Sequence, residues 1–277
     1  MVLESLIRYE TIRRKPQYIF IMGFVYSSVA IILSMILFKN QASLIMVFFT
    51  AFACFPFIYY AIKCEEKYDI IYEDQHRILK EHSKTVMTLV FMFLGFFVSF
   101  TLWAVLLPEQ LTNTLFSTQF HTISNLNAHV TGGAAMYSKY IFSIFLNNIK
   151  VLIFCIFFSF LYGAGAIFIL TWNASVGGAF IGNFIKTKLI AYSGLHALAL
   201  GLVRYMPHGI LEMGAYFVGA LAGGIISVAI IRHDLGSKKF FKIIFDSTEL
   251  IGIAVAMLFV ATLVEVFVTP NLVAILS

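Results

Sequence analysis

The chain has 277 residues, of which 60% are hydrophobic and 12% are charged, and its mean hydropathy is +0.91. Soluble domains carry about 25% charged residues, so this composition excludes an ordinary soluble protein and predicts an integral membrane protein. The net charge of +5 does not indicate nucleic-acid binding, because the basic residues flank apolar segments, where membrane topology accounts for them.

The N-terminal part of the chain predicts three membrane spans. Basic residues within 8–15 place the N-terminus in the cytoplasm, since basic residues favour that side of a membrane. The apolar segments 18–38, 44–62 and 86–107 are each long enough to cross a bilayer. Between the last two, segment 63–84 is densely charged, and we expect it to form a charged helical connector on the cytoplasmic side.

Segment 108–139 is polar but poor in Lys and Arg, which predicts an external location. Its apolar residues recur at spacings of three and four, which is typical of an amphipathic helix on the membrane surface, and an external loop is the alternative. His121 and His129 lie in this segment without any Cys or carboxylate at a metal-ligand spacing, so we interpret them as exposed loop residues.

The remainder of the chain is again mostly apolar. Segment 171–190 is rich in glycine and ends with Lys186 and Lys188, which predicts a short helix or a re-entrant segment that ends in the cytoplasm. The other spans are expected at 140–170, 190–205, 207–231 and 249–268. The predicted fold is an all-α, polytopic transmembrane helix bundle with about seven spans, forming a single integral membrane domain over 1–277 with an external C-terminus.

The helix expected from Pro207 onward combines an ionisable pair with a row of small residues. His208 and Glu212 lie about one helical turn apart and therefore share a helix face. Small residues then recur every fourth position, and such a ridge lets two membrane helices approach closely. The ridge consists of Ala215, Gly219, Gly223 and Ser227.

Polar residues from several segments are predicted to lie at one depth, near the outer ends of their helices. This cluster consists of Asn147, Asn148, Arg204, His208, Glu212 and Glu265. It can stabilise the bundle, with Arg204 or Lys150 neutralising Glu212; it can bind a lipid, peptide or partner helix; or it can act catalytically. No metal is expected, since only His208 and Glu212 show ligand spacing and a hydrolytic zinc site needs about three protein ligands.

Four features of the sequence occur together: the pair Asn147-Asn148 at the start of a span, Gly163 and Gly165 near the end of that span, Asn173 before a glycine-rich run, and the string from His208 to Glu212. They resemble the stage II sporulation protein M family over roughly residues 85–235. The resemblance implies a polytopic membrane protein. The namesake works with cell-wall hydrolases in endospore formers and anchors them, but the family also occurs in organisms that make no spores. Ala174 stands where the family more often has glycine.

These observations favour a non-enzymatic, multi-pass scaffold of the cell membrane that binds other membrane or envelope proteins, without a cofactor and without nucleic acid. Its surroundings would be the lipid bilayer, and a homo-oligomer is a further expectation. The alternative is a transporter or channel with a polar site near the outer leaflet. A metal-dependent intramembrane hydrolase built on His208 and Glu212 is a third hypothesis.

Overall fold

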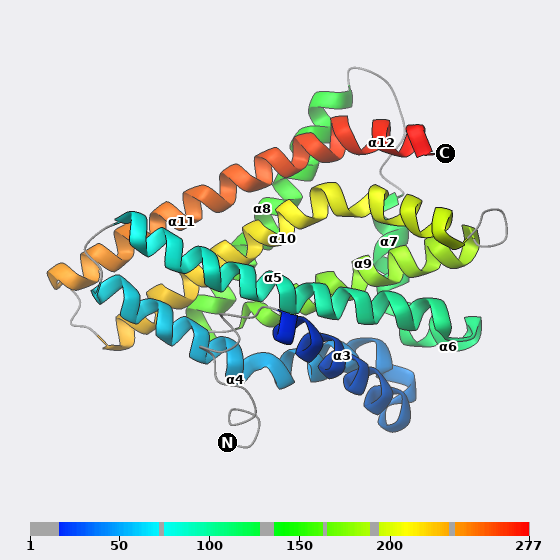
Figure 1. Cartoon of the computed structure of the whole chain (residues 1–277), viewed down its shortest axis with the longest axis horizontal. Coiled ribbons are helices and arrows are strands. Elements are labelled where there is room, and N and C mark those ends of the chain that lie inside the picture. The colour runs from blue at the N-terminus through cyan, green and yellow to red at the C-terminus, as the bar shows by residue number, and fades with distance from the viewer. Residues whose placement is uncertain are drawn as a thin grey trace.

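A computed structural model describes residues 17–71, 75–127, 136–162, 165–188, 194–232 and 236–276, and these residues contain helices and turns but no strand (Figure 1). The all-α prediction is therefore confirmed. The elements are α3 (Gln17–Leu37), η1 (Lys39–Gln41), α4 (Ala42–Ile71), α5 (Gln75–Leu106), α6 (Glu109–Leu115), α7 (Ser117–Asn127), α8 (Met136–Tyr162), α9 (Ala166–Lys188), α10 (Gly194–Arg232), α11 (Lys238–Leu263), the π-helix η2 (Val264–Val268) and α12 (Thr269–Leu276).

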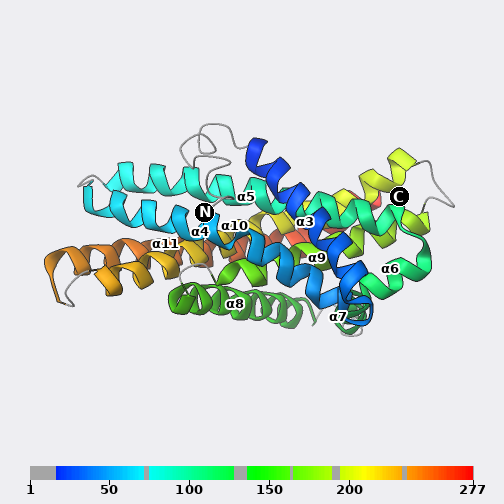
Figure 2. The ribbon, with the colours of Figure 1, turned by 90° about the horizontal axis from the view of Figure 1, so that it is seen from below.

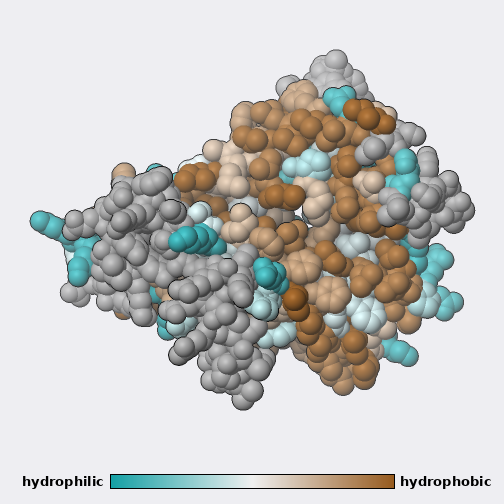
Figure 3. All heavy atoms as spheres, in the orientation of Figure 1, coloured by the Kyte–Doolittle hydropathy of each residue, from teal (hydrophilic) through white to brown (hydrophobic). Residues whose placement is uncertain are grey.

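Seven helical stretches are long and apolar enough to cross a membrane, as predicted. They are Gln17–Leu37, Lys39–Cys64, His82–Leu106, Ile141–Leu161, Ala166–Lys188, His196–Ile231 and Lys238–Ile275. Figure 3 shows broad hydrophobic surface over the described part of one face, with many of the hydrophilic residues towards the two ends of the long axis. Large apolar side chains such as Ile36 and Phe52, each 71% exposed, are expected on helices that face lipid.

Two of the predicted boundaries are wrong. The glycine-rich segment is not a separate short helix, because residues 171–188 belong to α9, a 23-residue helix that begins at Ala166 and is long and apolar enough to cross a membrane. The predicted spans 190–205 and 207–231 are one helix, α10, which continues through Pro207. A proline removes one backbone donor and bends a helix, but membrane helices tolerate it because neighbouring groups satisfy the freed carbonyl.

The end of α9 lies beside the end of α5, although the sequence analysis predicted these two ends on opposite sides of the membrane. Lys186 Nζ donates hydrogen bonds to the carbonyl oxygens of Ala104 and Leu107, at 3.2 and 2.5 Å, and to Thr112 Oγ1 at 3.0 Å. Its ammonium therefore satisfies carbonyl groups that the end of α5 leaves without helical partners. Lys186 and Leu107 therefore lie at the same end of the bundle, whereas the sequence analysis placed Leu107 at the external side and Lys186 in the cytoplasm.

Helix α10 forms the centre of the bundle. Every residue from Met213 to Ile225 is buried, as expected for a helix that is apolar on all sides. Figure 1 shows this yellow helix crossing the middle of the molecule, with α5 and α11 on either side of it in that view.

Helices α5 and α9 are in contact through glycines. A Cβ atom added at Gly178 would meet Phe100, and one at Gly182 would meet Ala104 and the carbonyl oxygen of Thr101. Small residues at these positions allow the two backbones to approach, which is how membrane helices gain packing contacts. The glycine-rich run is thus a helix-packing surface.

Helix α7 does not lie on the surface at its N-terminal end. Phe116 and Gln119 are fully buried, and the Phe116 ring meets Phe100 of α5 edge-on with a centroid separation of 6.5 Å. Gln119 Nε2 donates to Ser175 Oγ of α9 at 3.1 Å, and Ser43 Oγ of α4 donates to Gln119 Oε1 at 2.9 Å. Helices α6 and α7 therefore form a cap inserted between the ends of α4, α5 and α9. Residues 128–135 of the predicted external segment, with His129, lie outside the described residues.

Candidate functional site

The polar cluster lies where α8, α10 and the α11–η2–α12 unit meet. Asn148 belongs to the first half of α8, and Glu212 lies one turn after His208 on α10. Glu265 belongs to η2, which extends α11 towards the C-terminus. Three helices with no sequence adjacency thus bring polar side chains into one region of the bundle.

Asn148 connects two residues of α10. Its Nδ2 donates to Glu212 Oε1 at 2.7 Å, and its Oδ1 accepts a hydrogen bond from the Tyr216 hydroxyl at 3.2 Å. Asn148 is 7% exposed and Tyr216 is 2% exposed. Two members of the predicted cluster, Asn148 and Glu212, are therefore in contact, and both polar ends of the Asn148 amide are satisfied, as a buried amide requires.

His208 has different partners from Glu212. Its Nδ1 lies 3.3 Å from Thr269 Oγ1, at the start of α12, and its ring packs against Tyr205 with a centroid separation of 5.7 Å. The helix period puts His208 and Glu212 on one side of α10, but the first contacts α12 and the second contacts α8. No contact of His208 with Asn147 or Asn148 is among the described interactions.

Glu265 lies in an irregular segment. The π-helix places one extra residue in its turn, and such turns occur frequently at functional sites. The carbonyl oxygen of Val264 accepts two hydrogen bonds from Thr269, one from its backbone N–H and one from its hydroxyl at 3.2 Å, and these hold the start of α12 against the irregular turn. Glu265 is partly buried and close enough to Glu212 for the two carboxylates to interact electrostatically.

Two of the six predicted cluster residues do not join it. Asn147 is exposed on the outside of α8. Arg204 is also exposed, and its guanidinium lies 5.7 Å from the ring centre of Phe180 and 5.8 Å from that of Phe184. Lys150 is exposed as well, so neither cation pairs with Glu212. Within the described residues, the hydrogen bond to Glu212 comes from a neutral amide.

The small-residue ridge of α10 packs against α8, on the side of α10 that carries Tyr216. A Cβ atom at Gly219 would meet the Leu152 side chain, and one at Gly223 would meet the backbone of Ile156. Ala215 and Ser227, at the two ends of the ridge, are buried. Ridge and cluster together fix α8 on α10, by close packing and by buried hydrogen bonds.

Comparison with known proteins identifies the chain. The model of the family described as "Stage II sporulation protein M" matches residues 85–270, about two thirds of the sequence. The chain belongs to this family.

An uncharacterized protein of Methanocaldococcus jannaschii is 28% identical over 133 residues, which are 47% of this chain and 71% of that protein. No solved structure matches significantly. The matched region begins in α5 and ends in α12, so it contains Asn148, Glu212 and Glu265, whereas α3 and α4 precede it.

The site contains residues that the sequence analysis missed. Tyr216 follows Glu212 by four positions, so the helix period could have placed it on the same face. Because its neighbours in the sequence are apolar, the polar hydroxyl group of Tyr216 was not considered. Thr269 lies one residue past the predicted span 249–268. No spacing rule connects Thr269 to His208, because their contact depends on how α12, which continues from α11 and η2, packs against α10.

The described part of the chain contains no group of three or more His, Cys, Asp or Glu side chains that could hold a metal ion. His208 and Glu212 remain two residues with separate partners.

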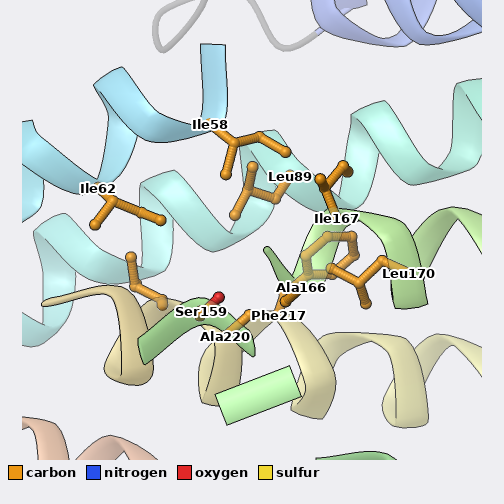
Figure 4. A pocket seen from close by; sticks show the side chains of 10 residues that line it. Ile58, Ile62, Leu89, Ser159, Ala166, Ile167, Leu170, Phe217 and Ala220 are labelled. Atoms are coloured by element: carbon orange, nitrogen blue, oxygen red, sulfur yellow. The ribbon is translucent and has the colours of Figure 1, made fainter. Parts of the chain in front are cut away.

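A second feature is a small apolar pocket between α4, α5, α8, α9 and α10 (Figure 4). Its lining residues are Ile58, Ile62, Leu89, Ser159, Ala166, Ile167, Leu170, Phe217, Ala220 and Leu221. Ser159 carries the only side-chain hydroxyl in this lining, and it lies about 16 Å along α8 from Asn148. The pocket is thus separate from the polar cluster and has the chemistry of a packing gap.

Proposed function

We propose that this protein is a non-enzymatic scaffold of the cell membrane, which binds partner proteins through its membrane-embedded surface. The family supports a polytopic membrane protein. The observation that carries the proposal is the hydrogen bonding within the polar cluster. Asn148 of α8 donates to Glu212 and accepts from Tyr216, so both bonds join α8 to α10. Polar groups used in this way hold helices in position.

The packing beneath the cluster favours the same function. A transport route would have to pass the centre of α10, where each residue from Met213 to Ile225 is buried. The pocket beside this stretch is lined almost entirely by apolar side chains. A rigid centre of this kind suits a protein whose outer faces bind other proteins.

The proposed orientation has a cytoplasmic N-terminus and an external C-terminus. With seven crossings, the two ends of the chain fall on opposite sides. The ends of α4 and α11 that carry Lys63, Lys238, Lys239 and Lys242 would be cytoplasmic, in agreement with the preference of basic residues for that side. Lys186 on the other side is explained by its bonds to the end of α5.

A transporter is the second candidate function. The observation that favours it is the interruption of α11 by η2, which holds Glu265 near Glu212 inside an apolar region. Discontinuous helices with ionisable residues are typical of transporter binding sites.

Purification of the tagged chain from its native membranes separates the two functions. A scaffold is expected to retain a partner protein in stoichiometric amount through gentle detergent extraction. The purified chain alone, in liposomes, is then expected to give no ion or solute flux above that of empty liposomes. Flux by the chain alone, with no partner retained, would overturn the scaffold proposal.

A further inference from the structure

One face of helix α8 is buried against the rest of the bundle. Asn148, Leu152, Cys155 and Ser159 are all buried, and they follow one another at spacings of four, three and four. This inner face meets the ridge of α10, with Leu152 against Gly219. Figure 2 shows α8 along the lower edge of the molecule, so its other side is the periphery of the bundle.

The outward side of α8 repeats with the same period. Its residues are exposed and also alternate at spacings of four and three, which is the pattern of a seam between two packed helices. We call this the outer seam of α8, and it consists of Ser143, Asn147, Lys150, Phe154, Phe157 and Leu161. Its first half is polar and its second half is apolar.

Lys150 is the unusual member of the outer seam. It lies at the middle of the 21-residue span Ile141–Leu161, and it is exposed on the outside of the bundle. Among the described residues no hydrogen bond or ion pair reaches its ammonium group. Lysines near the end of a span can extend to the interface, but a lysine at mid-span normally faces the bundle interior and pairs there.

We propose that the outer seam of α8 binds a membrane-spanning helix of a partner protein, and that a carboxylate of that helix pairs with Lys150. This inference rests on the proposed scaffold function and names its surface and the chemistry of its partner. An ammonium group in hydrocarbon is costly until an anion neutralises it, and charge complementarity therefore requires an Asp or Glu at the same depth. Asn147, one turn away, would accept or donate a further hydrogen bond across the interface.

The apolar half of the outer seam also suits a membrane-spanning partner helix. Phe154 and Phe157 are 54% and 50% exposed, and they lie on the same face as Lys150. A partner helix that pairs with Lys150 would cover these rings with apolar side chains. A paired polar position within a seam also fixes the axial register of the two helices.

A second copy of this chain fits the seam less well. In a parallel neighbour, the described carboxylates that are exposed are Glu109, which lies outside the spans, and Glu249. Glu249 precedes Glu265 on the same long helix by about 24 Å, whereas Glu265 shares the depth of Asn148 and nearly that of Lys150. The described part of the chain therefore offers no exposed carboxylate at the required depth.

Photo-crosslinking in native membranes tests the proposal. The photoreactive residue p-benzoylphenylalanine replaces Phe154 on the outer seam, and in a control chain it replaces Phe52 of α4, which is 71% exposed on another helix. The expected result is an adduct with a second protein from Phe154 alone, and mass spectrometry should find Asp or Glu within an apolar span of that protein.

Charge variants of Lys150 then test the ion pair. Lys150→Arg should preserve the adduct, and Lys150→Glu should reduce it by about tenfold or more, because like charges would meet at the interface. Replacing the partner's carboxylate by Lys should restore the adduct with Lys150→Glu. An unchanged melting temperature of the isolated Lys150→Glu chain shows that the loss is not unfolding.

Several results would overturn the proposal. They are an adduct of twice the mass of this chain, adducts with lipid only, or an adduct that Lys150→Glu leaves unchanged. If a partner is retained during purification but does not crosslink at Phe154, the outer seam is wrong and the scaffold function stands. If no partner is retained and the chain alone conducts flux, the scaffold function itself fails.

Discussion

Asn148 of α8 donates a 2.7 Å hydrogen bond to Glu212 of α10, although the two residues are 64 positions apart in the sequence. Asn147, its direct neighbour, is exposed on the other side of the helix. One helical step thus separates a side chain that fastens α8 to the core from one that belongs to the outer seam.

Replacing the two asparagines separately should give unequal effects on stability. Asn148→Ala leaves Glu212 and the Tyr216 hydroxyl without their partner, and we expect the free energy of unfolding to fall by about 1–2 kcal/mol. Asn147→Ala should change it by less than about 0.5 kcal/mol. Unfolding in detergent, followed by circular dichroism, measures both. Equal losses would argue that the buried hydrogen bonds do not fasten α8.

Two variants of Glu212 separate the loss of its charge from the loss of its whole polar side chain. Glu212→Gln keeps an oxygen that accepts from Asn148, so the melting temperature should remain close to that of the wild type. Glu212→Ala removes the acceptor and leaves a buried amide unsatisfied, which should cost about 1–3 kcal/mol. A complementation assay adds a functional reading: if Glu212→Gln is stable but fails to complement, the carboxylate has a role beyond holding the helices.

The glycines of α10 should differ from one another in a defined order. Gly223→Ala places a methyl group against the Ile156 backbone, which cannot rotate away, and should destabilise the protein by about 1–3 kcal/mol. Gly219→Ala meets the end of the Leu152 side chain, which can shift, and should cost less. Gly252 has no atom within contact distance of an added Cβ, so Gly252→Ala is the control. Thermal unfolding of the three variants in one detergent ranks them, and a Gly252 effect as large as that of Gly223 would contradict the packing argument.

Composition and apolar periodicity were sufficient to predict the all-α membrane fold and the number of spans, because bilayer thickness fixes the length of a crossing. The predicted boundaries between spans are wrong at two places, for opposite reasons. Pro207 was interpreted as a break, although α10 continues through it, and the turn at Gly165 was missed inside an apolar run. One false break and one missed turn compensated, so the count of seven stayed correct.

Only some members of the polar cluster were predicted correctly. Helix period and shared depth found Asn148 and Glu212, since the free energy of burying polar groups in hydrocarbon brings them together. Depth alone could not say which way a side chain faces around its helix, so exposed Asn147 and Arg204 were included with them. The contact between His208 and Thr269 depends on the path of the chain after η2, which no local pattern encodes.

Lys186 should contribute to stability through the end of α5. Lys186→Met keeps the apolar stem but removes the donor to the Ala104 and Leu107 carbonyls and to Thr112. A hydrogen bond from a charged group contributes about 1.5–3 kcal/mol net, and Lys186 is only partly buried, so we expect a loss of about 1–3 kcal/mol overall. Hydrogen exchange should rise around Leu107 and Thr112. Lys188→Met, two residues further along, is the control, and an equal change there would show that the effect comes from charge alone.

The last prediction concerns the side of the membrane on which α9 ends. Because α9 is long and apolar enough to cross, and because Lys186 binds the end of α5, position 188 should lie on the same side as Glu109, which follows α5. Single cysteines at these two positions, in a chain whose own three cysteines are replaced, should both react with a membrane-impermeant maleimide in intact cells. A cysteine at Lys84 or Lys238 should react only after permeabilisation. Positions 109 and 188 should behave alike whichever way the chain is inserted, so the comparison does not depend on the proposed orientation. Labelling of position 109 without position 188 in intact cells would mean that α9 does not cross, and that the glycine-rich segment is re-entrant after all.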